Sequence, residues 1–148
     1  MKLFPSILCL ILLPLAAALS DETKQNDYGA PAVEVEQEKG RWTLQGRRTG
    51  VDVSSSDLQM TLRTDGATWS TVASSAGDLV VEAGGKTHTL RLADARSRDI
   101  SPYRTGFKTG VKIALKDFHQ SDNEIDLSIA LFACLEGSNE DLVCEVVA

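Results

Sequence analysis

Two cysteines near the C-terminal end carry the side chains best suited to covalent chemistry in this sequence. Cys134 and Cys144 lie in the stretch LSIALFACLEGSNEDLVCEVV, residues 127–147, which has the pattern of two apolar strands joined by a polar turn. A five-residue loop from Gly137 to Asp141 would place the two cysteines directly opposite each other. Opposed Cβ atoms in an antiparallel pair are about 4.5–5.5 Å apart, whereas a disulfide needs about 3.5–4.5 Å, so a bridge requires only local adjustment.

The hairpin admits three interpretations of its cysteines. A disulfide is favoured by an oxidising compartment, and it would stabilise the chain by about 2–3 kcal/mol. A register shifted by one residue would instead place the sulfur atoms on opposite faces of the sheet, leaving two thiols that pack as small apolar groups. Catalysis or metal binding is the weakest interpretation, because no histidine stands nearby to complete a zinc site or to activate a nucleophile.

The remaining reactive side chains form no recognisable catalytic motif. His88 alternates into an apolar strand face and is expected to pack there, whereas His119 falls in a polar turn. Asp94, Asp99 and Asp117 lie in or near predicted loops, and nothing singles out a carboxylate pair about 5–10 Å apart of the glycosidase type. The sequence has no phosphate-binding glycine loop and no nucleophile elbow. We therefore predict no catalytic residue, no metal and no cofactor.

Aromatic side chains are the candidates for ligand binding. Tyr103 follows Pro102 in the longest irregular stretch, Ala93–Thr105, which we interpret as a loop or an edge crossing presented by a rigid sheet. Its ring could stack on a sugar, and it is the ligand-binding residue that we predict. Trp42 and Trp69 could serve the same purpose, but tryptophan is mostly buried, so both are expected in the core.

The charge of the chain limits its partners. The 148 residues carry a net charge of −6, which becomes −7 once Lys2 is removed with the leader described below. A nucleic-acid-binding protein needs a basic footprint, and electrostatic docking on an anionic membrane needs one too, so we expect neither partner. The two small basic clusters, Arg47-Arg48 and Arg96 with Arg98, are expected to be solvated turn charges.

Residues 1–20 have the pattern of a secretory signal peptide. A positive charge precedes the apolar run Leu3–Leu13, and the small residues Ala18 and Ser20 stand at the −3 and −1 positions of a cleavage site. The run is too short for a comfortable membrane span, which needs about 20 residues, so an N-terminal anchor is the weaker alternative. We therefore expect a secreted or periplasmic protein without membrane contact after cleavage.

The rest of the chain has the spacing of an antiparallel β-protein. Residues 21–40 are polar and form a linker or an edge strand, in which Val33 and Val35 alternate with glutamates. Beyond residue 40, short segments with alternating apolar residues are separated by turn signals such as Asp65-Gly66. Many short strands at about 8–12-residue spacing predict an all-β fold, an antiparallel β-sandwich over residues 41–148.

The later strands carry a resemblance to a known group of enzymes. The segments SPYRTGFKTGVKIALKDF and LFACLEGSNEDLVCEVV resemble the N-terminal β-sandwich of large secreted bacterial glycoside hydrolases, of the α-galactosidase and raffinose-synthase or endo-α-N-acetylgalactosaminidase type. The resemblance covers roughly Trp42 to the end and rests on strand texture and the LEG-x-x-EDLV turn. It implies a sandwich that precedes a (β/α)₈ barrel. Because the catalytic carboxylates of these enzymes lie in the barrel, no catalytic residue is carried over.

Two functions of different classes follow. The final strand is apolar on both faces, as in a strand covered on both sides, and the sequence stops within it at Val146-Val147-Ala148. We therefore expect a sandwich that is incomplete at its C-terminus. It would be a non-catalytic N-terminal domain, or a truncated fragment, of a secreted carbohydrate-active enzyme, supporting a C-terminal catalytic domain. The alternative is a stand-alone extracellular module that binds a glycan or a protein through Tyr103. An enzyme in its own right is least favoured, because no catalytic constellation is present.

Overall fold

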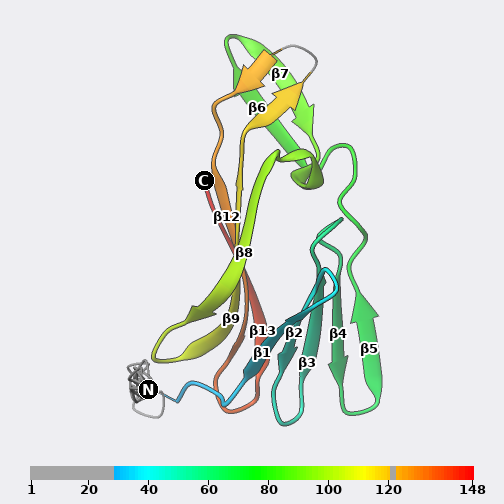
Figure 1. Cartoon of the computed structure of the whole chain (residues 1–148), viewed down its shortest axis with the longest axis vertical. Helices are drawn as coiled ribbons and strands as arrows, with labels where there is room; N and C mark the ends of the chain where they lie inside the picture. Colours follow the sequence, from blue (N-terminus) through cyan, green and yellow to red (C-terminus); the bar gives the residue numbers. More distant parts are fainter. Residues whose placement is uncertain (1–28, 121–122) are drawn as a thin grey trace, which may run out of the picture.

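The fold is built almost entirely from antiparallel strands. The structure is a computed structural model that describes residues 29–120 and 123–148, and the predicted signal peptide, residues 1–20, lies outside them. The all-β prediction is confirmed, because the strands of these two ranges form several antiparallel sheets and none of them closes into a barrel (Figure 1). The described residues contain no helix that is long and apolar enough to cross a membrane.

The first sheet has five strands in chain order, β1 to β5 (Figure 1). Their bounds are β1 Glu34–Glu38, β2 Arg41–Gln45, β3 Gly50–Ser54, β4 Met60–Thr64 and β5 Ala67–Ser70. Tight turns join successive strands, and Gly40 (φ 79°) and Gly66 (φ 85°) adopt left-handed conformations there, which glycine tolerates because it lacks a Cβ. Strand β1 occupies part of the segment predicted to be a linker or an edge strand, and it is an edge strand.

The second sheet has four strands in the order β13-β12-β9-β8. Their bounds are β8 Ser97–Arg104, β9 Lys108–Lys116, β12 Ile129–Glu136 and β13 Asp141–Val147. Strand β8 fills most of Ala93–Thr105, so this segment is an edge strand and the prediction of an irregular stretch is wrong. Because β8 contains charged residues and Pro102, its sequence lacks the apolar alternation that indicates a strand. Proline is accepted because β8 lies at an edge, where no further strand needs its missing N–H.

Two hairpins lie together at one end of the molecule (Figure 1). They are β6 Leu79–Ala83 with β7 Lys86–Leu90, and β10 Phe118–Gln120 with β11 Asn123–Ile125. A short 3₁₀ turn, Leu92–Asp94, follows β7 and leads into β8. These hairpins extend the sandwich along its long axis and leave its outer faces open.

The core lies between the inner faces of the two sheets. Residues directly opposite each other on paired strands share a face, and one row of the first sheet runs through Leu44, Val51, Leu62 and Trp69. Leu44 and Val51 are fully buried, whereas Trp69 on β5 is 56% exposed. The prediction of a core position is therefore confirmed for Trp42, which is buried, and wrong for Trp69. Five strands face four, so β5 extends beyond the strands that could cover it.

One buried carboxylate joins the two sheets at their turns. Glu140 lies in the β12–β13 turn with a left-handed backbone (φ 59°), and its side chain is buried. Its Oε1 accepts the N–H of Arg47 at 2.8 Å, and its Oε2 accepts the N–H groups of Arg48 at 2.8 Å and Thr49 at 2.9 Å, all from the β2–β3 turn. A Cβ built on Gly46 would collide with this carboxylate, so the close approach requires glycine there.

The surroundings of Glu140 favour its charged form. Burial alone would raise the pKa, but the backbone N–H groups of Arg48, Arg47 and Thr49 outweigh it, and the pKa lies below its ordinary value. The guanidinium of Arg47, with Nε 3.6 Å from Oε1, acts in the same direction. The carboxylate therefore satisfies three backbone donors and stays ionised at neutral pH.

We expect Glu140→Gln to lower the free energy of unfolding by about 2–3 kcal/mol at neutral pH, because an amide satisfies the three donors less well than a carboxylate. The folded-state pKa is depressed, so the carboxylate's contribution is complete above the unfolded pKa of about 4.3 and is lost as pH falls through the lower folded pKa. Urea unfolding of wild type and variant from pH 7 to acidic pH measures both effects. The gap between the two proteins should close in acid.

The matched control for this substitution is Glu82→Gln, which changes an exposed carboxylate on β6. It should leave the free energy of unfolding nearly unchanged at every pH. A gap between wild type and Glu140→Gln that stays constant down to acidic pH would contradict the role given to the charge.

Candidate functional site

Tyr103, the predicted ligand-binding residue, lies on the outer face of the four-stranded sheet. It belongs to β8 and stands opposite Gly110 on β9, which stands opposite Cys134 on β12. The neighbouring row through Ile113 and Leu131 faces the core. Because successive strand residues point to opposite faces, the row of Tyr103 faces outward, where a ligand can reach it.

The ring of Tyr103 is held by a second aromatic ring. It contacts Phe132 edge to face, with ring centroids 4.7 Å apart and an interplanar angle of 60°. The two residues come from β8 and β12, which lie on either side of β9, so both rings must lean across β9. Gly110 is the β9 residue opposite Tyr103, and a Cβ there would collide with the carbonyl oxygen of Ala133. Glycine at this position therefore lets the backbones of β9 and β12 approach closely.

Two lysines complete this outer surface. The Nζ of Lys108 lies 6.0 Å from the ring centroid of Tyr103 and 5.9 Å from that of Phe107, and the Nζ of Lys112 lies 6.0 Å from that of Phe132. Ammonium groups at this range are attracted to aromatic faces. We name the set the aromatic–lysine cluster, and its members are Tyr103, Phe107, Lys108, Lys112 and Phe132.

Lys108 is held in place by an ion pair with β13. Its side chain is only 8% exposed, and its Nζ donates to Oε2 of Glu145 at 2.6 Å. The hydrogen bond that Lys108 donates to Glu145 raises the pKa of Lys108 more than burial lowers it. The lysine therefore stays charged, and the charge of Glu145 is balanced within its own sheet.

The cysteines do not face each other. Cys134 stands opposite Val143 and Cys144 stands opposite Ala133, and both thiols are free. The predicted register is wrong by one residue, and with it the predicted Cys134–Cys144 disulfide, because the two side chains point to opposite faces of the sheet. The physical reason is the turn. Asp141 already pairs with Glu136, so the loop is one residue shorter than predicted and ends at Glu140 in its buried position.

The two thiols have different surroundings. Cys134 is fully buried on the outer face, and burial raises its pKa to about 11. Cys144 is exposed on the inner side of β13, and desolvation also raises its pKa. A thiol with a raised pKa holds little thiolate at neutral pH, so neither cysteine is an activated nucleophile.

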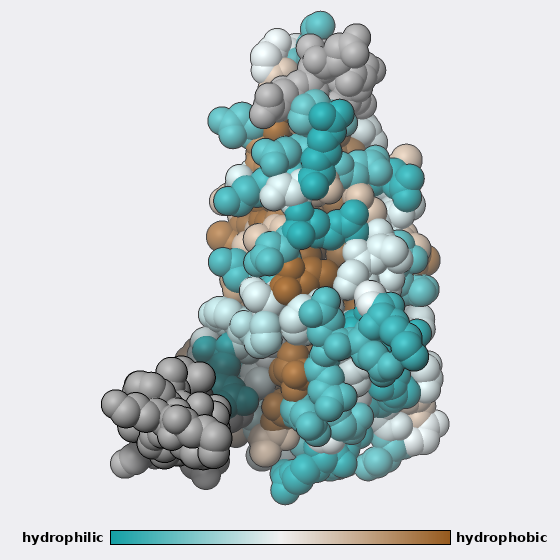
Figure 2. All heavy atoms as spheres, in the orientation of Figure 1, coloured by the Kyte–Doolittle hydropathy of each residue, from teal (hydrophilic) through white to brown (hydrophobic). Residues whose placement is uncertain are grey.

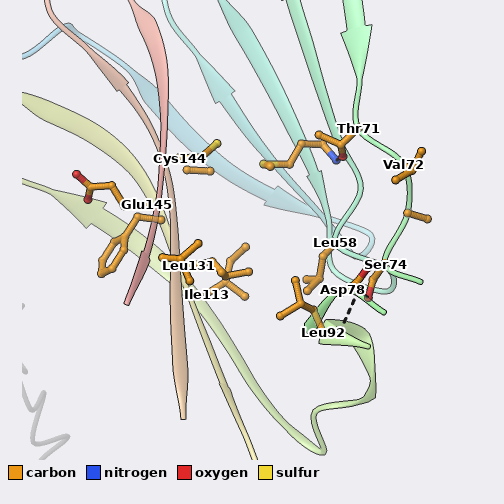
Figure 3. Close-up of a pocket in the computed structure, with 15 residues that line it drawn as sticks. Leu58, Thr71, Val72, Ser74, Asp78, Leu92, Ile113, Leu131, Cys144 and Glu145 are labelled. Atoms are coloured by element: carbon orange, nitrogen blue, oxygen red, sulfur yellow. Dashed lines mark hydrogen bonds between the residues drawn. The ribbon is translucent and has the colours of Figure 1, made fainter. Parts of the chain in front are cut away.

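A groove opens beside β13, where the two sheets diverge. It encloses about 250 Å³, and its lining is mostly apolar. Figure 3 shows Ile113 and Leu131 on one wall and Leu58 and Leu92 on the other, with Cys144 near its mouth. Apolar side chains are also visible along the middle of the molecule in Figure 2. The core is therefore less completely covered on this side.

The other residues considered for chemistry are dispersed. His88 is half-buried, with Nε2 3.3 Å from the carbonyl oxygen of Ala83, and the Nδ1 of His119 lies 3.2 Å from the carbonyl oxygen of Asp117. Asp94 and Asp99 are exposed. Within the described ranges, no three His, Cys, Asp or Glu side chains lie close enough to hold a metal ion.

One basic residue has a structural role that the sequence did not suggest. Arg98 donates from Nη1 to the carbonyl oxygens of Ser55 and Ser56, at 2.5 Å and 2.9 Å, and so links β8 to the first sheet. The prediction that it is a solvated turn charge is wrong. Arg47 and Arg48 keep exposed side chains, as predicted, although their backbone N–H groups bind Glu140.

The cluster around Tyr103 contains residues that the sequence analysis missed. Phe132, Lys108 and Lys112 come from two strands other than β8, so their approach to Tyr103 depends on register. One signal was present. Gly110 interrupts an otherwise regular strand pattern, and an isolated glycine inside a strand indicates a close approach of another group.

Comparison with known proteins adds no further assignment. No family model, no curated protein and no solved structure matches the chain. The resemblance to N-terminal domains of glycoside hydrolases stays a prediction, and the chemistry of the outer surface is argued from this chain's own residues.

We expect alkylation of the folded, dilute protein by a maleimide at mildly alkaline pH to label Cys144 and to spare Cys134, because only the first is exposed. Unfolding in urea should make Cys134 reactive as well. Peptide mass spectrometry locates the label. A Cys134–Cys144 bridged peptide that disappears on reduction would contradict the register described above.

Proposed function

We propose that this protein is a secreted or periplasmic, non-catalytic module that binds carbohydrate on the outer face of its four-stranded sheet. The signal-peptide pattern of residues 1–20 supports the location. The observation that carries the function is the position of Tyr103, whose half-buried ring is fixed by Phe132 beside the 48% exposed ring of Phe107. The aromatic–lysine cluster thus offers apolar faces and charged donors side by side.

The chemistry of the cluster suits a sugar. A pyranose ring has an apolar face of C–H groups that can pack on an aromatic ring, and hydroxyls at its rim that need polar partners. Tyr103 and Phe107 provide rings, whereas Lys112 and the partly exposed carboxylate of Glu145 provide a donor and an acceptor. The side chains stand on a paired sheet and Tyr103 packs on Phe132, so little entropy is lost when they bind a ligand.

A screen of the purified protein on a glycan array should identify a ligand, whose affinity is then measured by titration calorimetry. Tyr103→Ala should weaken binding by about tenfold or more, because it removes a stacking ring. Tyr103→Phe keeps the ring and should retain most of the affinity. Thermal unfolding of each variant shows whether the loss of the Phe132 contact has affected the fold.

Trp69→Ala is the matched control, because Trp69 is an exposed aromatic residue on the other sheet. It should leave glycan affinity unchanged. Failure of the wild-type protein to bind any glycan, or an equal loss of affinity in Trp69→Ala, would contradict the assignment of the site.

A second candidate is a supporting domain that packs against a catalytic domain of a carbohydrate-active enzyme. One observation favours it: three of the four residues in one row of the outer face, Ala114, Ala130 and the exposed Val147, are apolar, and the fourth is Asp99 on the edge strand β8. Such a row fits cover by another protein surface. Sequencing the encoding gene beyond the codon for Ala148 tests this candidate. A continuing frame that encodes a catalytic barrel would support it, and a stop codon in reliable sequence would contradict it.

A further inference from the structure

Strand β13 is a seven-residue sheet edge with little charge, whereas the uncharged edge strand β5 of the described first sheet has only four residues. Edge strands normally carry charges or proline that discourage pairing with another chain. At one edge of the first sheet, β1 has the sequence EVEQE, and at the far edge of the second sheet, β8 contains Pro102 and three charged residues. Strand β13 has the sequence DLVCEVV, in which Glu145 is the only charge after the first residue.

The charge of Glu145 does not protect the edge of β13. The carboxylate of Glu145 is turned toward Lys108 on β9, and Nζ and Oε2 are 2.6 Å apart. Figure 3 shows Glu145 on the opposite side of the strand from the groove. The balanced charge therefore offers little repulsion to a strand that approaches β13 from outside.

Apolar side chains are exposed along this edge. The inner-face residues of β13 are Leu142, Cys144 and Val146, and Val146 is 67% exposed. On β5 of the first sheet, Trp69 also points to the inner side, and it is exposed. A strand added beside β13 would widen the four-stranded sheet to five strands, the number in the sheet that it faces.

We propose that β13 pairs with β13 of a second copy of this chain, antiparallel and about a two-fold axis that passes beside Cys144. The strand Asp141–Val147 is centred on Cys144, so this register pairs the whole strand with its copy. Cys144 then faces Cys144, Leu142 faces Val146, and Asp141 faces Val147. Residues of the inner face meet residues of the inner face, which a continuous sheet requires.

Charge selects this register over its neighbours. Every alternative register must also pair inner-face residues with inner-face residues, so the centre of the pairing can move only by whole residues along β13. A centre at Val143 would place Asp141 opposite Glu145, and a centre at Glu145 would place two Glu145 side chains opposite each other. Like charges directly opposed are unfavourable, and both alternatives also pair fewer residues. The register centred on Cys144 opposes no like charges.

Sedimentation velocity of the full chain under reducing conditions, over a range of micromolar concentrations, should show a monomer–dimer equilibrium. Val146→Lys should weaken the dimer by about tenfold or more, because a lysine at an edge position blocks strand pairing. The matched control is Val80→Lys, the same substitution at a residue on β6 that is also 67% exposed. It should leave the equilibrium unchanged. A monomer at every concentration, or equal effects of the two variants, would overturn the proposal.

Cys144 provides a test of the register. Oxidised glutathione added at mildly alkaline pH can accept two electrons from a facing pair of Cys144 thiols, which lose two protons and form one interchain disulfide while two glutathione thiols are released. Nonreducing electrophoresis should then show a covalent dimer that Cys144→Ser abolishes and that Cys9→Ser and Cys134→Ala retain. A dimer without this cross-link, or a cross-link through another cysteine, would overturn the register.

Discussion

The buried carboxylate of Glu140 is the contact on which the arrangement of the two sheets depends. It lies in the turn between the last two strands and accepts three backbone N–H groups from the turn between β2 and β3. Without the carboxylate these N–H groups would lose their partner, and an unsatisfied buried donor is costly. The same carboxylate sets the length of its own turn. It therefore decides both how the sheets meet and which residues of β12 and β13 stand opposite each other.

The register set at that turn decides which side chains of the last hairpin face the core and which face outward. Odd-numbered residues of β12 face the core, and even-numbered residues face outward. Cys134 is therefore buried beneath the outer cluster, whereas Cys144 lies on the groove side. The pairing of β9 with β12 also depends on Gly110, because a Cβ there would collide with the backbone of Ala133 and Cys134. A small shift in register would separate the members of the cluster.

Local sequence patterns predicted the strands, but they did not predict which residues of different strands become neighbours. Period-two alternation identified most strands of the first sheet, since one buried face imposes it directly on the sequence. Strand β8 was missed because an edge strand tolerates charge and proline. Tyr103 was found as a single residue, whereas its partners lie on other strands and meet it only through pairing. Trp69 was expected in the core because burial was argued from residue type, and residue type does not show that a fifth strand lacks cover.

The sequence by itself determined the fold class, the acidic character of the chain, its turn positions and the pattern of a secretory leader, because each of these depends on local composition or spacing. Only the tertiary structure decided the hairpin register, the separation of the two cysteines, the assembly around Tyr103 and the open edge at β13. These features depend on contacts between residues far apart in the chain. A one-residue difference in a turn changes every such contact in a sheet, and here the buried position of Glu140 makes that choice.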